Sequence, residues 1–331
     1  MIIKKEKKDG ITILYVRANI DAKALESQMG KQIKTSAIHN ILKEDTDVYV
    51  LEKEDAVGKE EEDGEKGKEE EKGKGKLLLR FRKALISKDM CNDFYNAVIE
   101  CARTKTSNRA AFQGVIGARE AKKNKYVMSN IFGFMDGWAP SQKKVFTKAG
   151  DAILKPDIRM TRFNMYSPDK YTKTLPFLHV VDSFYKRLVP DCYAKQYAKA
   201  AQIRGFTIDD TAFTTITLNL NHPSRLHTDK GDDDEGFGNL SVIEHGGKYT
   251  GGETCFPRYG LGADVRTGDI LFMNVHEPHC NLPIQYSTND AERLSIVCYL
   301  RKNIWIKGKV MTRKKRALHN ATVKKRFLKK I

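Results

Sequence analysis

A histidine and an aspartate near position 230, and two histidines farther on, have the side chains that a mononuclear metal site needs. His227-Thr228-Asp229 is the only pair with His-x-Asp spacing in the 331 residues. Residues i and i+2 of an extended backbone point to the same side, so both side chains can reach one ion. Two histidines and one carboxylate commonly hold redox-active Fe(II) and leave other positions open. Both His276 and His279 are candidates for the third ligand.

The segments after this pair predict the turns and strands that would carry such a site. The sequence GGETCFP at 251–257 indicates a tight turn into a strand, and Gly268-Asp269 opens a second strand that leads to the two histidines. Arg293 begins another apolar run, and Ser295 lies two residues on, on the same strand face. A guanidinium binds a carboxylate through two parallel hydrogen bonds. Arg293 therefore suits a dicarboxylate, and Ser295 can add a hydroxyl donor.

The elements that must position these residues are helices followed by strands. Ser87 precedes apolar residues at helical spacing, and a second helical stretch is expected over 178–204, interrupted at Pro190. From Ala212 onward, short β-branched or apolar runs alternate with Gly, Asp and Pro, which predicts strands. The expected strands are 213–220, 240–243, 270–273 and 294–300. This pattern predicts an α+β fold, in which a sandwich or double-sheet jelly roll is buttressed on one face by the earlier helices.

Composition divides the chain into four expected parts. Residues 1–52 contain two short β-like runs and predict a small N-terminal module of unknown role. Residues 53–76 are highly charged and have almost nothing to bury, which predicts a flexible linker. Residues 77–305 hold the motifs and are expected to be the catalytic domain. Residues 306–331 are expected to be a basic tail.

The charge of the chain is strongly positive, at a formal +17. Residues 301–331 contain thirteen Lys or Arg and no acidic residue, so the tail contributes most of the excess. Such a surface attracts polyanions, chiefly nucleic acid or anionic membrane, although a solvated tail that aids solubility has the same composition.

The cysteines and the apolar segments indicate where the protein works. None of the six cysteines forms a CxxC pair, which argues against a disulfide framework or a zinc knuckle. The N-terminus is charged and predicts no signal peptide. No apolar run approaches the ~18 residues of a membrane span. We therefore expect a soluble, intracellular protein with no membrane partner.

In order and spacing, the motifs resemble the double-stranded β-helix oxygenases that use Fe(II) and 2-oxoglutarate. The resemblance implies a double-stranded β-helix core and iron ligation by His227 and Asp229. In the resembled families the distal histidine lies eleven residues after the glycine of the Gly-Asp turn, which favours His279 over His276. The resemblance also implies that the far carboxylate of 2-oxoglutarate pairs with Arg293.

Ser295 and Asn219 are the further candidates for co-substrate binding. Ser295 belongs to the Arg-x-Ser motif. Asn219 lies in the expected strand 213–220, where it either approaches 2-oxoglutarate or an iron-bound water, or serves as a packing or turn residue.

Other segments are similar to the TET/JBP branch of this superfamily, which oxidises the 5-methyl group of thymine or 5-methylcytosine in DNA. They lie at 107–110, 157–163, 213–219, 230–232, 236–240 and 275–277. Three residues depart from the pattern of that branch, namely Ala110, Asp157 and Cys280, and none is an expected iron ligand. The roles of Arg109, Arg159 and Thr161, which match family segments, are left open, with structural support as the default.

The resemblance implies hydroxylation of a DNA methyl group with Fe(II), 2-oxoglutarate and O2, and ascorbate as a reductant. The base must be flipped out or bound single-stranded, and the nucleus or a site of DNA replication is the expected location. Two alternatives remain. Protein hydroxylases that act on Pro or Lys, and small-molecule hydroxylases, share the metal skeleton, but commonly have Lys in place of Arg293. A binding module on a decayed oxygenase scaffold would not need all three ligands.

Overall fold

The computed structural model describes residues 1–52, 75–105, 128–136, 144–146, 152–154 and 158–310. Most of the expected linker (53–74), the segment 107–110 with Arg109, Asp157, and residues 311–331 of the basic tail lie outside the described residues. Within the described part, no helix is long and apolar enough to cross a membrane.

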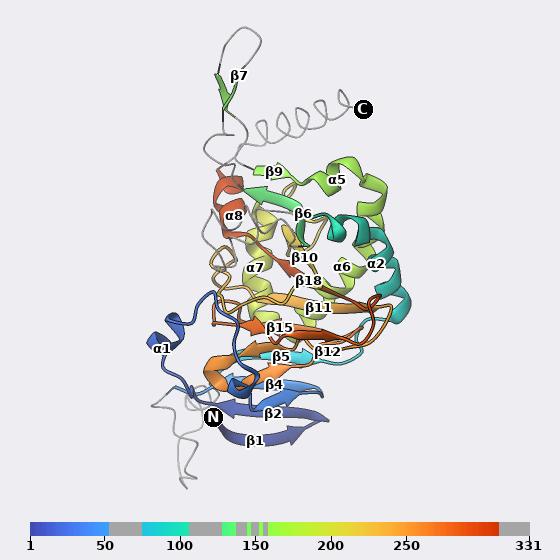
Figure 1. Ribbon diagram of the computed structural model, residues 1–331. Coiled ribbons are helices and arrows are strands. Elements are labelled where there is room, and N and C mark those ends of the chain that lie inside the picture. Colours follow the sequence, from blue (N-terminus) through green and yellow to red (C-terminus); the bar gives the residue numbers. More distant parts are fainter. Residues whose placement is uncertain (53–74, 106–127, 137–143, 147–151, 155–157, 311–331) are drawn as a thin grey trace.

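One large sheet organises the molecule (Figure 1). Among the described residues it contains ten strands in the order β1-β2-β4-β5-β15-β11-β18-β10-β6-β9. The strands are β1 (Ile2–Lys8), β2 (Ile11–Val16), β4 (Thr46–Val50), β5 (Lys76–Arg82), β15 (Ile270–Met273), β11 (Gly238–His245), β18 (Glu292–Tyr299), β10 (Thr215–Leu220), β6 (Ser129–Asp136) and β9 (Ile158–Met160). The β-branched and apolar runs predicted as strands are thus present, with small shifts at their ends.

Three smaller sheets are also present among the described residues. The described residues include a four-stranded sheet in the order β16-β13-β14-β3 and the pairs β12-β17 and β7-β8. Their strands are β16 (Cys280–Asn281), β13 (Thr254–Phe256), β14 (Leu261–Ala263), β3 (Asn40–Leu42), β12 (Tyr249–Gly251), β17 (Ile284–Tyr286), β7 (Lys144–Phe146) and β8 (Ala152–Leu154).

The strands of residues 1–52 are built into these sheets. β4 pairs antiparallel with β5, and β3 pairs parallel with β14. The boundary expected near residue 77 therefore falls inside the large sheet, between the paired strands β4 and β5. This pairing satisfies strand edges that would otherwise be left open. The division of the chain into domains itself stays a prediction.

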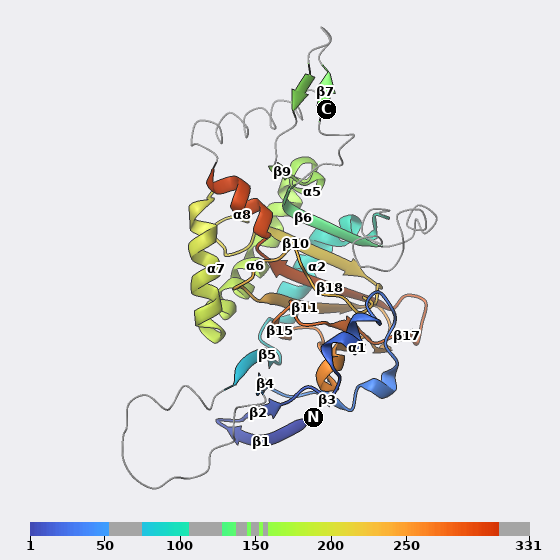
Figure 2. The same cartoon turned by 90° about the vertical axis from the view of Figure 1, so that its left-hand side faces the viewer.

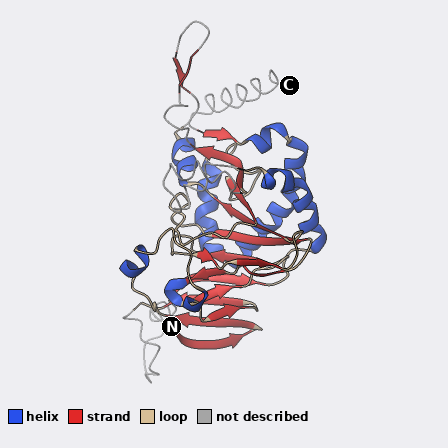
Figure 3. Ribbon diagram, viewed as in Figure 1, coloured by secondary structure: helices blue, strands red, loops and turns tan. Residues whose placement is uncertain are grey.

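Helices cover one face of the large sheet. α2 (Lys88–Arg103) begins after Ser87, whose hydroxyl accepts from the backbone N–H of Met90, as the sequence predicts. α6 (Pro168–Leu188) and α7 (Pro190–Gln202) follow, separated at Val189. Figure 2 shows α6 and α7 on one side of the sheet and α1 (Ala22–Glu26) on the other, and Figure 3 shows the helices gathered together. The remaining described helices are η1 (Thr35–Ala37), α5 (Arg162–Tyr166), η3 (Pro257–Tyr259) and α8 (Lys302–Lys309).

Alternation along β18 separates a helix-facing core from an inner face. Leu294, Ile296 and Cys298 belong to the core under the helices. Val297 instead packs against the core between the large and the four-stranded sheets. Because successive strand residues point to opposite faces, Arg293 and Ser295 lie on the same inner face as Val297. The structure is thus a mixed α/β fold in which the inner face of the large sheet carries Arg293 and Ser295.

Candidate active site

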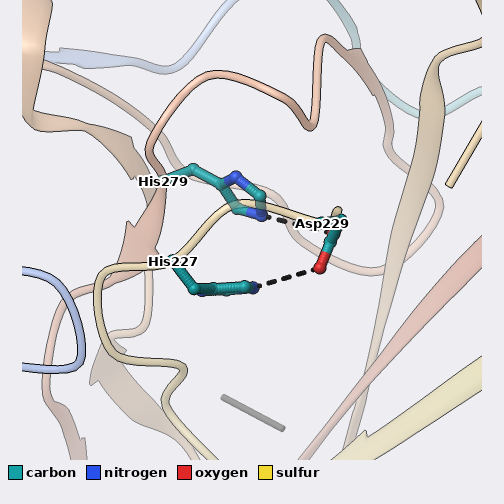
Figure 4. Close-up of side chains that lie close together, drawn as sticks. All are labelled: His227, Asp229 and His279. Atoms are coloured by element: carbon teal, nitrogen blue, oxygen red, sulfur yellow. Dashed lines mark ion pairs between the residues drawn. The ribbon is translucent and has the colours of Figure 1, made fainter. Parts of the chain in front are cut away.

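His227, Asp229 and His279 converge on one point (Figure 4). Nε2 of His227 lies 3.5 Å from Oδ1 of Asp229, and Nε2 of His279 lies 3.6 Å from Oδ2 of the same residue. The three candidate ligand atoms all lie within 4.8 Å of one another. Atoms at these separations can surround one divalent ion at the bond lengths of about 2 Å that imidazole and carboxylate ligands make.

Backbone hydrogen bonds hold the two histidines side by side. His227 and His279 form an antiparallel bridge, in which each amide donates to the carbonyl of the other at 3.0 and 2.9 Å. The amide of Asp229 donates to the carbonyl of Val275 at 3.0 Å. The His-x-Asp segment therefore runs beside the segment that precedes β16, and its extended backbone directs both side chains to one side.

Each imidazole is oriented by a bond from its other ring nitrogen. Nδ1 of His227 lies 2.7 Å from the carbonyl of Arg225, and Nδ1 of His279 lies 2.9 Å from the carbonyl of Glu277. A carbonyl only accepts, so Nδ1 carries the proton and donates, and the Nε2 lone pair is directed at Asp229. Metal-binding histidines are commonly fixed in this way. The donor set therefore fits a divalent metal ion.

The cluster is more enclosed on the His279 side. The side chain of His279 is 6% exposed, against 32% for that of Asp229. Burial lowers the pKa of His279, but the Asp229 carboxylate would stabilise the protonated ring and outweighs this effect, so the pKa is raised above its usual value. Asp229 thus stabilises positive charge at this point, as it would for a bound cation.

His276 is not part of this cluster. Its Nε2 lies 3.0 Å from the carbonyl of Asp233, and its amide donates to Oδ1 of Asn274. The described residues contain one group of three possible ligands, and it includes His279 rather than His276.

Arg293 is a buried positive charge on the inner face of the large sheet. The side chain is almost fully buried, and its Nη2 donates to the carbonyl of Gly252 at 2.9 Å. Within the described part of the chain, no Asp or Glu pairs with it. A buried guanidinium without a counter-ion is costly, so this group fits a ligand that brings a carboxylate. Position 252 must be glycine for Arg293 to lie here, because a Cβ at this position would be only 2.9 Å from Nε of Arg293.

Ser295 and Asn219 lie beside each other in the large sheet. They are opposite each other across β10 and β18, and the Ser295 hydroxyl donates to the Asn219 carbonyl at 3.5 Å. Oδ1 of Asn219 accepts from the hydroxyl of Ser129 at 2.5 Å. Both residues are buried on the face that carries Arg293, and their part in co-substrate binding stays a prediction.

Two residues of the family segments, Thr161 and Arg159, make local contacts near α5 and β9. Thr161 donates its hydroxyl to Oδ1 of Asn164 at 2.9 Å at the start of α5. Arg159, on β9, lies with Nη2 3.2 Å from the sulfur of Met135.

Asn221 is a site residue that the sequence did not single out. Its side-chain Oδ1 accepts from the backbone N–H of Arg293 at 2.7 Å, and its backbone N–H donates to the carbonyl of Arg293 at 2.9 Å. Its φ of 51° places it in the left-handed region that asparagine tolerates. An asparagine directly after a strand was the available signal, but its partner became visible only in the fold.

The N-terminal segment also contacts the two segments that carry His227 and His279. The amide of Gly30 donates to the carbonyl of Leu226 at 2.8 Å, and the amide of Leu226 donates to the carbonyl of Lys31 at 3.1 Å. Nε2 of Gln32 donates to the carbonyl of Asn281 at 2.8 Å. Leu226 directly precedes His227, and Asn281 follows His279 by two residues, so residues 30–32 bind both segments that carry the histidines.

Comparisons with known proteins point to one family. Residues 148–302 match the family model Tet_JBP, described as the oxygenase domain of the 2OGFeDO superfamily. Over 187 residues, covering 55% of this chain and 22% of the relative, the chain is 30% identical to the thymine dioxygenase JBP1-A of Trypanosoma cruzi. Over 220 residues, covering 66% of this chain and 18% of the relative, it is 29% identical to the bifunctional helicase and thymine dioxygenase JBP2 of Leishmania braziliensis.

The chain spans only about a fifth of the length of these curated relatives, 22% and 18%. Among solved structures, NgTET1 in complex with 5mC DNA matches with a TM-score of 0.49 and 13% identity, over 91% of this chain and all of that chain. The superfamily implies Fe(II), 2-oxoglutarate and O2. Residues 148–302 thus match the oxygenase domain of the Tet_JBP family, which belongs to the 2OGFeDO superfamily.

Proposed function

We propose that this protein hydroxylates the 5-methyl group of a pyrimidine base in DNA, either 5-methylcytosine or thymine. One arrangement of residues carries the proposal. Two histidines and an aspartate meet at one point, and a buried arginine without a counter-ion among the described residues lies on the inner face of the large sheet. The relatives named thymine dioxygenases support the choice of a DNA base as substrate.

In this proposal, His227, Asp229 and His279 hold Fe(II) through two Nε2 atoms and a carboxylate oxygen. The carbonyls of Arg225 and Glu277 keep the rings turned so that Nε2 faces the metal. Three protein ligands leave the other coordination positions for small molecules. The protein thereby fixes where the reaction can occur.

Arg293 then supplies the counter-charge for the far carboxylate of 2-oxoglutarate, with Ser295 and Asn219 beside it. When bound, Fe(II) with 2-oxoglutarate and O2 supplies the oxidising power that converts a methyl group to hydroxymethyl and 2-oxoglutarate to succinate and CO2. The inner face of the sheet excludes water around Arg293, which strengthens its attraction for a carboxylate.

A base stacked in a duplex cannot reach a site on the inner face of a sheet. The nucleotide must be flipped out or come from a single strand, at a cost of a few kcal/mol for unstacking. Lysine and arginine contacts to phosphate can offset that cost. We propose the basic tail, which includes Arg313–Arg316 by sequence, as one source of these contacts.

We also propose that the β core is a double-stranded β-helix. The antiparallel pairs β10-β18, β18-β11 and β11-β15 supply one layer, and β16-β13-β14 supplies a second. Buried residues of both layers, such as Val242 and Phe256, belong to one core. Closure of two such layers around a site is the arrangement of a jelly roll.

The test is a nucleoside digest after incubation with defined DNA. The full chain is incubated with Fe(II), 2-oxoglutarate and ascorbate, and with single- or double-stranded DNA that contains 5-methylcytosine, thymine or neither. We expect succinate release and 5-hydroxymethyl nucleosides by mass spectrometry only with the methyl-bearing DNA. The Asp229→Ala variant is the matched control and should give neither product. The base that reacts tells the two substrates apart.

A parallel reaction with proline- and lysine-rich peptides addresses the main alternative. If peptides become hydroxylated while every DNA remains unchanged, the protein is a protein hydroxylase and the proposal is wrong. Full activity of the Asp229→Ala variant would reject the metal assignment.

A further inference from the structure

Residues 30–34 are held beside the candidate metal site. The backbone of residues 30–31 exchanges two hydrogen bonds, of 2.8 and 3.1 Å, with Leu226, which directly precedes His227. Ile33 is buried in the same small core as Leu226. Figure 2 shows α1, which precedes this segment, on the opposite side of the large sheet from α6 and α7. The fold therefore fixes this segment next to the chain that carries His227.

Two lysines of this segment extend into solvent. Lys31 and Lys34 are exposed, whereas Ile33 between them is buried. Within the described part of the chain, neither lysine forms an ion pair. Residues 27–43 contain three lysines and no acidic residue, so the neighbouring sequence supplies no counter-ion. We call Lys31 and Lys34 the basic lip.

The metal cluster is most open on the side that the basic lip borders. The side chains of His227 and Asp229 are 16% and 32% exposed, whereas that of His279 is 6% exposed. The more exposed pair belongs to the segment that residues 30–31 bind. A large ligand that reaches the cluster from solvent therefore approaches past the basic lip.

The acidic run that follows the His-x-Asp segment does not cancel this charge. Residues 232–235 are four consecutive acids. Three of them pair with lysines of α7 and α8. The pairs are Asp233 with Lys199, Glu235 with Lys199 and Asp234 with Lys302. The helical layer thus neutralises most of the acidic run, and the charge of the basic lip remains available to a partner.

The chemistry of the basic lip fits a phosphate backbone. A DNA duplex carries one negative charge for about every 1.7 Å of its axis, and a lysine that neutralises a phosphate releases a bound counter-ion. When a single base enters an enclosed site, the rest of its strand stays outside. Phosphates next to that base therefore lie at the open side of the site, where the two lysines are.

We propose that Lys31 and Lys34 bind the DNA phosphates that flank the base at the metal site. This inference rests on the proposed function, because it takes DNA as the substrate. It also gives residues 1–52 a role. They supply a DNA contact from outside residues 148–302, which match the family model.

The experiment compares three double variants of the full chain. Lys31→Gln/Lys34→Gln removes the charge of the basic lip, and Lys31→Arg/Lys34→Arg retains it. Lys5→Gln/Lys8→Gln is the matched control, because it removes the same charge from exposed lysines of β1, which five strands of the large sheet separate from β18. Each protein is loaded with Mn(II) in the absence of O2. Fluorescence anisotropy then gives its affinity for one duplex that contains 5-methylcytosine, over a range of salt concentrations.

The expected result is a change in the salt dependence of only one variant. For Lys31→Gln/Lys34→Gln, the fall of log affinity with log salt concentration should be less steep than in wild type by about 1.8, since each phosphate contributes about 0.9. The Arg variant and the β1 control should keep the wild-type slope. In turnover, Lys31→Gln/Lys34→Gln should raise KM for DNA and leave kcat and KM for 2-oxoglutarate unchanged.

Three results would overturn the inference and leave the proposed function intact. The first is a wild-type slope in Lys31→Gln/Lys34→Gln. The second is an equal loss of slope in the β1 control, which would show an effect of net charge alone. The third is an equal loss in the Arg variant, which would show that charge at these positions is not what binds. If wild type itself neither binds nor hydroxylates DNA, the proposed function fails together with the inference.

Discussion

At the scale of single residues, two histidines that lie three positions apart in the sequence have different partners. His279 shares a backbone bridge with His227, whereas His276 points its ring at the carbonyl of Asp233. The two rings therefore have different tasks. His276 helps to anchor the loop that runs from Asn274 to Glu277, and His279 faces the aspartate.

This difference predicts opposite effects on metal binding. We expect His279→Ala to weaken divalent metal binding by more than about 100-fold, because even the loss of a group that only orients a ligand costs about 10–100-fold. His276→Ala should remain within about tenfold of wild type. Anaerobic titration with Co(II), followed by its visible absorption, measures both variants. Tight binding by His279→Ala together with weak binding by His276→Ala would reverse the assignment.

Sequence spacing predicted much of this site, and the reasons are local. A His-x-Asp pair in extended backbone, and two residues on alternate positions of β18, have geometry that follows from strand periodicity. The choice between His276 and His279 did not follow from the residues alone, because it depends on a bridge between distant segments. Asn221 was missed for the same reason, because its importance lies in its hydrogen bonds to Arg293, which only the fold brings together.

At the scale of elements, the segment after β2 packs against the segments that carry His227 and His279. A small core contains Leu25 and Ile33 from this segment together with Leu226 and Cys280, the neighbours of the two histidines. Cys255 and Cys280 lie opposite each other in β13-β16, under the same residues. Movement of this core would therefore shift both histidine backbones.

A pair of matched substitutions tests this support. Ile33→Ala and Ile304→Ala remove the same atoms from two buried sites, and each should lower the free energy of unfolding by about 2–5 kcal/mol. Ile33 packs in the core beside the two histidine segments, and Ile304, on α8, packs in a separate cluster with Phe206. We expect only Ile33→Ala to weaken Co(II) binding. Urea unfolding and Co(II) titration give the two quantities, and equal metal affinity in both variants would contradict the role.

The helical layer shows why element boundaries were harder to predict. The sequence predicts helix over 178–204 with a break at Pro190, and the break is confirmed between α6 and α7. α6 begins earlier, at Pro168, because proline is tolerated in the first turn of a helix. Pro176 lies inside α6 and hid this earlier part, since an internal proline normally marks a helix end.

At the scale of the whole molecule, long-range pairing joins parts that composition separates. β3, at residues 40–42, runs parallel to β14, at residues 261–263. Nothing in the local sequence of either strand specifies that partner, so residues 1–52 were predicted only as a small module of unknown role. Their hydrogen bonds to the histidine segments connect them physically to the candidate site.

The charge of the molecule leads to a prediction about DNA binding. Residues 311–331 contain nine Lys or Arg and no acidic residue, about half of the net charge of +17. If these residues bind phosphate, the log of DNA affinity should fall less steeply with the log of salt concentration once they are deleted, by about 0.9 for each phosphate that they neutralise. Fluorescence anisotropy with one duplex over a range of salt concentrations measures the slope.

A full-length variant with the nine residues changed to Gln separates charge from chain length and should give the same flattened slope. A slope equal to that of wild type in both variants would assign phosphate binding to residues 1–310, where the lysines of α8 are then the next residues to substitute.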